Sequence, residues 1–220
     1  RQNNTLEDFA QTYFRRWFVE DSSDDWDVGK AEDYFEIGIG KTPPRKEHKW
    51  FTNNPNDKVW ISIADMGKSG LFIGDSSEYL TSEAVERFNI RRVPKGSILL
   101  SFKLTVGRVA VALCELTTNE AIAHFKYKEA IYREYLYCYL KSFDYNSLGS
   151  TSSIATAINS TIIKEMPFVM PDKCKLTKFH ELTAPIFRKI ETNILQMTTL
   201  QKLRDTLLPK LISGEVRVKQ

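Results

Sequence analysis

The sequence predicts an α+β fold, in which one globular body of short strands and helices lies between two long helices. Apolar residues recur at helical spacing near both ends of the 220-residue chain. Between them, short β-branched runs are separated by Gly, Pro and Ser turn signals. We therefore predict three parts: a helix in residues 1–22, the body in 23–172 and a second helix in 173–220.

The first helix is predicted over residues 3–20. Thr5 or Asn4 can cap it, and Glu7 and Asp8 then lie in the first turn, where acidic side chains are favoured. A polar linker follows in residues 21–27. The stripe predicted to pack against other parts of the protein consists of Leu6, Phe9, Ala10, Tyr13, Phe14, Trp17 and Phe18.

The body is predicted from alternating and apolar runs. A short helix at 81–88 is capped by Thr81 or Ser82, and an aromatic-rich helix spans 129–142. Turns are expected at 68–70 and 93–97, and a Gly/Ser/Thr loop at 148–153. The expected strands are 59–63, 71–73, 98–102 and 107–113, and segments 161–164 and 167–171 close the body.

The last helix follows Asp172, a predicted N-cap, and its apolar residues over 179–211 fall at heptad spacing. At ~1.5 Å per residue it is about 50 Å long, so the first helix, at most ~27 Å long, covers only about half of it. We predict an antiparallel coiled coil. We also predict that these helices pair with another chain through the uncovered seam, most tightly between Phe179 and Leu200. Asn193 fixes the register if it faces a polar partner. The predicted interface comprises Leu6, Tyr13, Trp17, Phe179, Ile186, Ile190, Met197, Leu200 and Leu207.

Composition places the chain among ordinary soluble proteins. It is 42% hydrophobic and 27% charged, and no apolar run approaches 18 residues, so no membrane span is expected. Cys114, Cys138 and Cys174 are far apart and fit a reducing cytoplasm. Residues 41–110 hold 12 basic and 7 acidic groups. This excess is compatible with nucleic acid on one face, and a mixed solvated surface is the alternative.

No catalytic group of residues is predicted from the sequence. No metal site is predicted either, because His48, His124 and His180 have no zinc-ligand spacing. Gly40, Lys41 and Thr42 resemble the end of a phosphate-binding loop, but Phe35 stands where that motif needs Gly, and two prolines follow. A stand-alone enzyme that binds a phosphate ligand or nucleotide there is the alternative hypothesis.

Two loops carry groups suited to phosphate and base-edge contacts. The turn at 101–108 combines cations with hydroxyls, and the loop near 150 offers hydroxyls and backbone N–H groups. The alternative for each is a turn that satisfies its own hydrogen bonds. A proline-stiffened loop after residue 42 carries further cations. The candidate DNA-binding residues are Arg45, Lys46, Lys49, Lys68, Lys103, Thr105, Arg108, Ser150, Thr151 and Ser152.

Several segments along the chain form an ordered set of motifs. The set comprises residues 3–19, Gly40-Lys-Thr-Pro, Val59-Trp-Ile-Ser-Ile, Val93-Pro-Lys-Gly-Ser, Thr105-Val-Gly, Thr118-Asn-Glu, Gly149-Ser-Thr and Leu203-Arg-Asp-Thr-Leu-Leu-Pro. Over almost the whole chain, this set resembles one half of a type I restriction-modification specificity (S) subunit. In that family, the first segment would be the end of a spacer helix, the next two the opening of a target recognition domain, and the last the distal helix ending. Glu120 departs from the family, where Gln is more usual.

The resemblance implies that the chain reads one half of a bipartite site in double-stranded DNA and has no catalytic activity. Its helices would set the gap between half-sites and dock the methylation subunits. S-adenosylmethionine, ATP and Mg would belong to the methylation and restriction subunits, and no cofactor is expected in this chain. The resemblance leaves open whether the chain is a C-terminal half or a half-sized subunit, which would pair with the other half or with a second copy.

Overall fold

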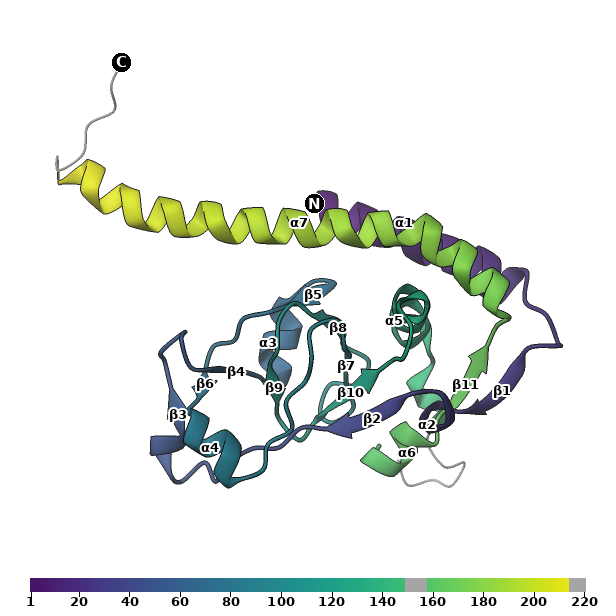
Figure 1. The fold of residues 1–220 in the computed structure, drawn as a ribbon, viewed down its shortest axis with the longest axis horizontal. Helices are drawn as coiled ribbons and strands as arrows, with labels where there is room; N and C mark the ends of the chain where they lie inside the picture. The colour runs from purple at the N-terminus through teal and green to yellow at the C-terminus, as the bar shows by residue number, and fades with distance from the viewer. Residues whose placement is uncertain (149–157, 214–220) are drawn as a thin grey trace, which may run out of the picture.

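The computed structural model describes residues 1–148 and 158–213. Two helices, α1 (Gln2–Arg15) and α7 (Lys173–Ile212), lie together across one side of an α+β body (Figure 1). The predicted fold class is confirmed. No helix in the described part of the chain is long and apolar enough to cross a membrane.

The two long helices run antiparallel. Near the start of α1, the Asn193 side-chain amide of α7 donates a hydrogen bond to Asn3 Oδ1 at 2.8 Å. At the other end, after α1 has passed into a π-helical turn (Arg16–Glu20), the rings of Trp17 and Phe179 lie 6.2 Å apart. Asn193 therefore faces a polar partner, but within its own chain. The regular coiled coil remains a prediction.

A five-stranded sheet forms the centre of the body, in the order β2-β10-β7-β8-β5. Its strands pair antiparallel except β5 with β8, which are parallel. On β10, which lies between β2 and β7, His124 is opposite Gly38 on one side and Leu99 on the other. The strand bounds are β2 (Glu36–Ile39), β10 (Ile122–Lys126), β7 (Ile98–Ser101), β8 (Val109–Ala112) and β5 (Phe72–Ile73).

A smaller four-stranded sheet lies at the end of the body away from β1 and β11 (Figure 1), in the order β3-β6-β4-β9. Its strands are β3 (Phe51–Thr52), β6 (Tyr79–Leu80), β4 (Lys58–Ile61) and β9 (Thr117–Thr118). The remaining pair, β1 (Asp27–Lys30) with β11 (Pro167–Met170), joins the body to the long helices. The body helices are α2 (Ala31–Tyr34), α3 (Ile63–Lys68), α4 (Ser82–Arg87), α5 (Arg133–Ser142) and α6 (Ser160–Lys164), with 3-10 turns at His48–Trp50, Ala130–Tyr132 and Tyr145–Leu148.

Side-chain caps explain where several helices begin. Asp172 Oδ1 accepts a hydrogen bond from the Lys175 N–H at 2.8 Å and starts α7, as predicted. Thr81 caps α4 in the same way, also as predicted. The α1 cap was predicted wrongly: the helix begins at Gln2 without a side-chain cap, because the residues expected to cap it already lie within its turns.

Two body segments also differ from the prediction. The strand expected over 59–63 ends at Ile61, since Ser62 and Asp65 form a capping box that starts α3. Lys68, expected in a turn, is therefore the last residue of that helix. Residues 161–164, whose structure was left unspecified, belong to α6, which is capped by Asn159.

The largest core cluster joins the helices to the central sheet through aromatic rings. Phe18 contacts Tyr135 of α5 and Phe179 of α7 at centroid distances of 4.7 and 5.1 Å. Such edge-to-face pairs contribute about 0.5–1.5 kcal/mol each beyond the area they bury. Of the predicted α1 stripe, Ala10, Phe14 and Phe18 are buried, whereas Phe9 and Tyr13 are exposed. The first half of α7 is therefore part of the core of the body.

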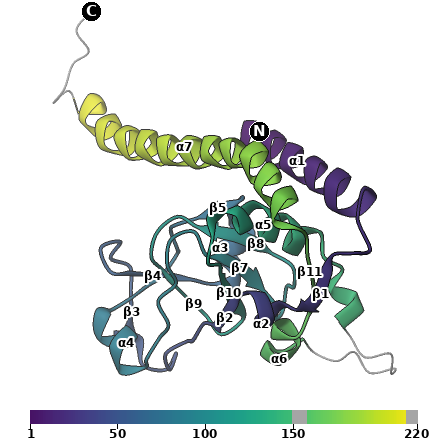
Figure 2. The same cartoon turned by 45° about the vertical axis from the view of Figure 1, so that its right-hand side comes forward.

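The second half of α7 extends beyond α1 and the body. Figure 2 shows that α7 bends in the part nearest the body. Pro185 lies within the helix and has no backbone N–H, so the hydrogen bond to the Glu181 carbonyl is missing, which explains a bend. Of the predicted interface residues on α7, Phe179 and Ile190 are buried and Ile186 is half-buried. The exposed apolar side chains on the outer half are Leu195, Met197, Leu200, Leu203, Leu207, Leu208, Leu211 and Ile212.

Candidate nucleic-acid interface

The loop after β2 is fixed tightly to the rest of the body. A Cβ on Gly40 would lie 2.1 Å from the Asn119 carbonyl oxygen, so only Gly allows this close backbone approach. The Lys41 ammonium donates to the Phe88 carbonyl at 2.7 Å, and the Thr42 hydroxyl donates to the Glu120 carboxylate. No helix begins at Lys41 or Thr42. The geometry therefore offers no phosphate cradle of the kind that the alternative enzyme hypothesis requires.

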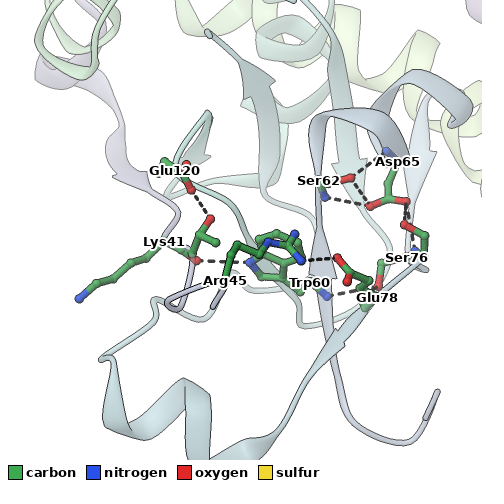
Figure 3. A network of polar contacts seen from close by, with 10 residues as sticks. Lys41, Arg45, Trp60, Ser62, Asp65, Ser76, Glu78 and Glu120 are labelled. Atoms are coloured by element: carbon green, nitrogen blue, oxygen red, sulfur yellow. Dashed lines mark hydrogen bonds and ion pairs between the residues drawn. The ribbon is translucent and has the colours of Figure 1, made fainter. Parts of the chain in front are cut away.

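Further along this loop, Arg45 is held between aromatic rings and a carboxylate. Its guanidinium carbon lies 4.2 Å from the Phe51 ring centroid and 4.6 Å from that of Trp60. One guanidinium nitrogen pairs with Glu78 at 2.7 Å, and Trp60 Nε1 donates to the Lys41 carbonyl (Figure 3). The Arg45 side chain nevertheless remains half exposed. A stacked, pre-oriented guanidinium with a solvent-facing edge can donate to a phosphate or to the O6 and N7 of guanine.

A second group of cations surrounds Trp50. The Lys49 ammonium lies 4.3 Å from the Trp50 ring centroid, and the Arg87 guanidinium of α4 lies 5.4 Å from it. Glu47 accepts the Trp50 Nε1–H at 3.0 Å and lies 3.7 Å from the Lys49 ammonium. Lys46, on the same loop, is exposed. This end of the body thus presents several cations within one short segment.

Asp65 ties α3 to the loop that carries Glu78. Its carboxylate accepts hydrogen bonds from the N–H and hydroxyl groups of both Ser62 and Ser77. Burial alone would raise the pKa of Asp65, but these four hydrogen bonds outweigh it and lower the pKa. Figure 3 shows this network beside the Arg45 pair. The network therefore positions Glu78, and through it Arg45, as well as α3, which ends at the exposed Lys68.

The hairpin between β7 and β8 carries three further candidates. Lys103 and Thr105 are exposed at its tip. Arg108 is half-buried, and its Nη1 donates to the Ile63 carbonyl at 2.6 Å, so it ties the hairpin to the start of α3. Part of the Arg108 guanidinium is thus committed to the fold, and its role in DNA binding remains a prediction.

The structure therefore arranges the candidates in two connected groups. Arg45, Lys46 and Lys49 lie on the loop over the small sheet, and Lys68, Lys103, Thr105 and Arg108 lie on or around α3. The Asp65 network links the two groups. Ser150, Thr151 and Ser152 lie outside the described residues. Within residues 1–148 and 158–213, no group of three or more His, Cys, Asp or Glu residues is placed to hold a metal ion.

Sequence reasoning missed the aromatic supports of this surface. Phe51 and Trp60 meet Arg45 through the pairing of β3, β6 and β4, whose register no local pattern in the sequence specifies. It also missed Leu104, an apolar residue within the predicted polar turn. Its only signal was the placement of a Leu between Lys103 and Thr105.

Comparison with known proteins gives one family. A model described as the type I restriction modification DNA specificity domain matches residues 23–200. The MjaIX type I restriction enzyme specificity subunit of Methanocaldococcus jannaschii is 27% identical over 197 residues, which are 88% of this chain and 45% of that protein. The HindI specificity subunit of Haemophilus influenzae is 26% identical over 195 residues, covering 87% of this chain and 42% of that protein. The chain thus spans under half the length of these relatives.

Solved structures share the fold. The HsdS subunit from Thermoanaerobacter tengcongensis superimposes with a TM-score of 0.60 and 16% identity, over 97% of this chain and 52% of that one. The S subunit of the type I restriction-modification system from M. genitalium gives a TM-score of 0.58 and 15% identity, over 95% and 54% of the two chains. At these identities the likeness establishes the architecture alone.

Proposed function

The chain belongs to the family of type I restriction modification DNA specificity domains, and on this basis we propose that it reads one half of a bipartite site in duplex DNA. The body supplies the recognition surface, and the long helices connect it to the rest of a type I restriction-modification complex. The chain itself carries specificity and performs no catalysis.

One observation carries this proposal. The family match covers the body that presents a pre-oriented Arg45 and three exposed cations, Lys49 and Lys103 on turns and Lys68 at the end of α3. Cations on turns can neutralise phosphates and add salt-dependent affinity. Arg45, stacked on two rings, combines this charge with a fixed donor geometry, which is the requirement for reading a base edge.

The partners follow from the same family membership. We propose that the methylation subunits dock on α1 and α7, and that a restriction subunit joins through the assembled complex. S-adenosylmethionine, ATP and Mg act on those subunits, and the complex works in the cytoplasm. Adenine methylation requires a flipped base in a separate pocket, for which the partner supplies the chemistry.

The outer half of α7 is the proposed site of pairing between two halves of a specificity unit. Leu200 and Leu203 are 64% and 50% exposed, within the longer row of apolar side chains beyond Ile194. Leaving 200–300 Å² of such surface in water costs several kcal/mol at ~25 cal/mol per Å². A second copy of this chain, or the other half of its subunit, would cover it with an equivalent helix.

Selection from a random duplex library tests the proposed function. The purified chain is incubated with duplexes that carry a randomised central region, and bound DNA is recovered by filter binding and sequenced over several rounds. We expect enrichment of one short motif. Filter binding of labelled ATP to the same chain tests the alternative, in which the chain is an enzyme that binds a nucleotide. Failure to enrich any motif, with saturable binding of ATP instead, would replace the proposal by that alternative.

A further inference from the structure

The tip of the β7–β8 hairpin presents an unusual side chain. Leu104 is 97% exposed, the highest value among the large apolar side chains that the structure describes. Its φ is +61°, in the left-handed region that is unfavourable for a residue with a Cβ. Two unfavourable features thus coincide at one residue, and Gly would avoid both.

The backbone fixes Leu104 in this position. The Thr105 N–H donates to the Lys103 carbonyl at 2.7 Å, which closes a γ-turn centred on Leu104, and positive φ at its centre is the rare and strained form. Ser101 Oγ donates to the Thr105 carbonyl at 2.5 Å and accepts from the Arg108 N–H at 3.0 Å. The turn is therefore held from inside the hairpin.

The stem below the tip is anchored to the body. The Phe102 side chain is buried, and its N–H donates to the Ala121 carbonyl at 2.9 Å. Gly107, with φ +87°, packs against Tyr145, and Arg108 reaches the Ile63 carbonyl. The stem thus holds Leu104 outward at a fixed position. Backbone strain that the surrounding structure maintains is found most often at functional sites.

Charge identifies the partner of this tip. Lys103 precedes Leu104, and Lys68 ends α3, the helix to which Arg108 ties the hairpin. No acidic residue occurs between residues 101 and 113. An apolar side chain flanked by cations suits a polyanion with an apolar interior, and duplex DNA has stacked bases behind its phosphates.

We propose that Leu104 is an apolar wedge that enters the minor groove and partly unstacks one base step of the recognised DNA. A narrow γ-turn at the tip of a hairpin fits a groove about 6 Å wide. Leu is one of the side chains that proteins insert between base pairs to kink DNA. Because flexible pyrimidine–purine steps unstack most easily, the wedge adds selectivity at a step without a hydrogen bond to it. This inference rests on the proposed function.

The test uses the duplex enriched by selection, with 2-aminopurine placed at each adenine in turn. Binding of the unmodified chain should raise the fluorescence at one step, because unstacking relieves quenching. Leu104→Ala and Leu104→Gly should lose that rise and bind at least tenfold more weakly, because they remove the apolar side chain that the DNA would bury. Val28→Ala removes another exposed apolar side chain, 65% exposed on β1, and should behave as the unmodified chain does.

Measuring the Tm of the Leu104 variants distinguishes a role of Leu104 in DNA binding from a role in stabilising the fold. Because Gly accepts positive φ without strain, Leu104→Gly should unfold at or above the Tm of the unmodified chain while binding DNA more weakly. Selective binding and an unstacked step that survive in both Leu104 variants would overturn the wedge and leave the proposed function intact. Leu104 variants that keep DNA binding but lose the methylation subunits would also overturn it. An unmodified chain that binds no duplex would overturn both proposals.

Discussion

Gly40 and Arg45 show what single residues reveal before the fold is known. The glycine lies in a segment similar to a phosphate-binding loop, yet its role is to let the loop approach the Asn119 carbonyl. Arg45 could be predicted as a surface cation, but its stacking on Phe51 and Trp60 could not, because those rings arrive through long-range strand pairing. Residue type thus predicted the chemistry of the surface and left its geometry open.

His124 makes the stability of the body depend on pH. Its side chain is fully buried on β10, and Nδ1 has no hydrogen-bond partner in the described part of the chain. Burial, reinforced by the positive charges of Arg91 and Lys126, lowers the pKa of His124 from 6.5 to about 3. The unfolded chain therefore takes up a proton below pH 6.5 that the folded chain excludes. Stability is complete above pH 6.5 and is lost as the pH falls toward about 3.

We predict that this residue alone lowers the free energy of unfolding by about 2 kcal/mol between pH 7 and pH 5. Guanidinium unfolding at both pH values measures the loss. His48→Gln, at an exposed position, should keep it, and His124→Gln should remove it. An NMR titration provides a check that does not depend on a variant: a His124 ring that charges near pH 6.5 in the folded protein would refute the prediction.

Lys49 and Lys103 should act on DNA through their charge. Both are exposed, so their replacement leaves the core intact. In the double variant Lys49→Ala with Lys103→Ala, we expect weaker binding to every duplex and a decrease of nearly 2 in the slope of log K against log salt concentration. Arg108 is left unchanged, because its loss would release the hairpin from α3.

Filter binding over a range of salt concentrations measures this slope. The matched control is Lys189→Ala with Lys202→Ala, which removes two exposed cations from α7 and should leave the slope unchanged. Equal slopes for the two double variants would place the DNA on a different surface.

Among the elements, α7 was predicted well in its extent, and its role in assembly stays a prediction. Its N-cap and its length of 40 residues agree with the apolar periodicity and the position of Asp172. The heptad frame placed Ile190 and Met197 at equivalent seam positions, but Ile190 is 1% exposed in the core and Met197 is 54% exposed. Periodicity identifies which face of a helix is apolar, but it does not indicate how far the partner extends along it.

The shortest strands could not be predicted from the sequence. Among the strands in residues 1–148 and 158–213, β3, β5, β6 and β9 contain only two residues each, which is too short for an alternating pattern to be visible. Their pairing is determined by distant segments of the chain. The helix α3 was missed for another reason, because the capping box at Ser62 and Asp65 follows directly after a clear strand pattern.

The two halves of α7 should respond differently to charge. Ile190→Asp buries a carboxylate in the core and should lower the free energy of unfolding by about 3–5 kcal/mol. Leu203→Asp, at a half-exposed position, should leave the Tm within a few degrees but weaken self-association or binding of the other half. Thermal unfolding and sedimentation at several concentrations measure both effects. If Leu203→Asp unfolded the chain and Ile190→Asp did not, the division of α7 would be incorrect.

At the scale of the whole molecule, sequence and structure agree on one α+β body beneath an antiparallel helix pair. The order of elements was predictable because the apolar patterns at the two ends are long and periodic. The proposed recognition surface was not predictable, because Asp65, Glu78 and Arg108 connect parts of it that are distant in sequence. These parts are the loop after β2, helix α3 and the β7–β8 hairpin. Predicted domain boundaries at residues 22 and 172 stay predictions.

The specificity ratio of the chain tests the central claim most directly. It is the Kd for a scrambled duplex of the same composition divided by the Kd for the enriched duplex, measured at one physiological salt concentration. A chain that reads sequence should give a ratio of about 10³ or more, because specific DNA-binding proteins typically exceed their non-specific affinity by 10³–10⁷. A ratio near one, with steep salt dependence for both duplexes, would show a basic surface that binds phosphates without reading bases, and would contradict the account.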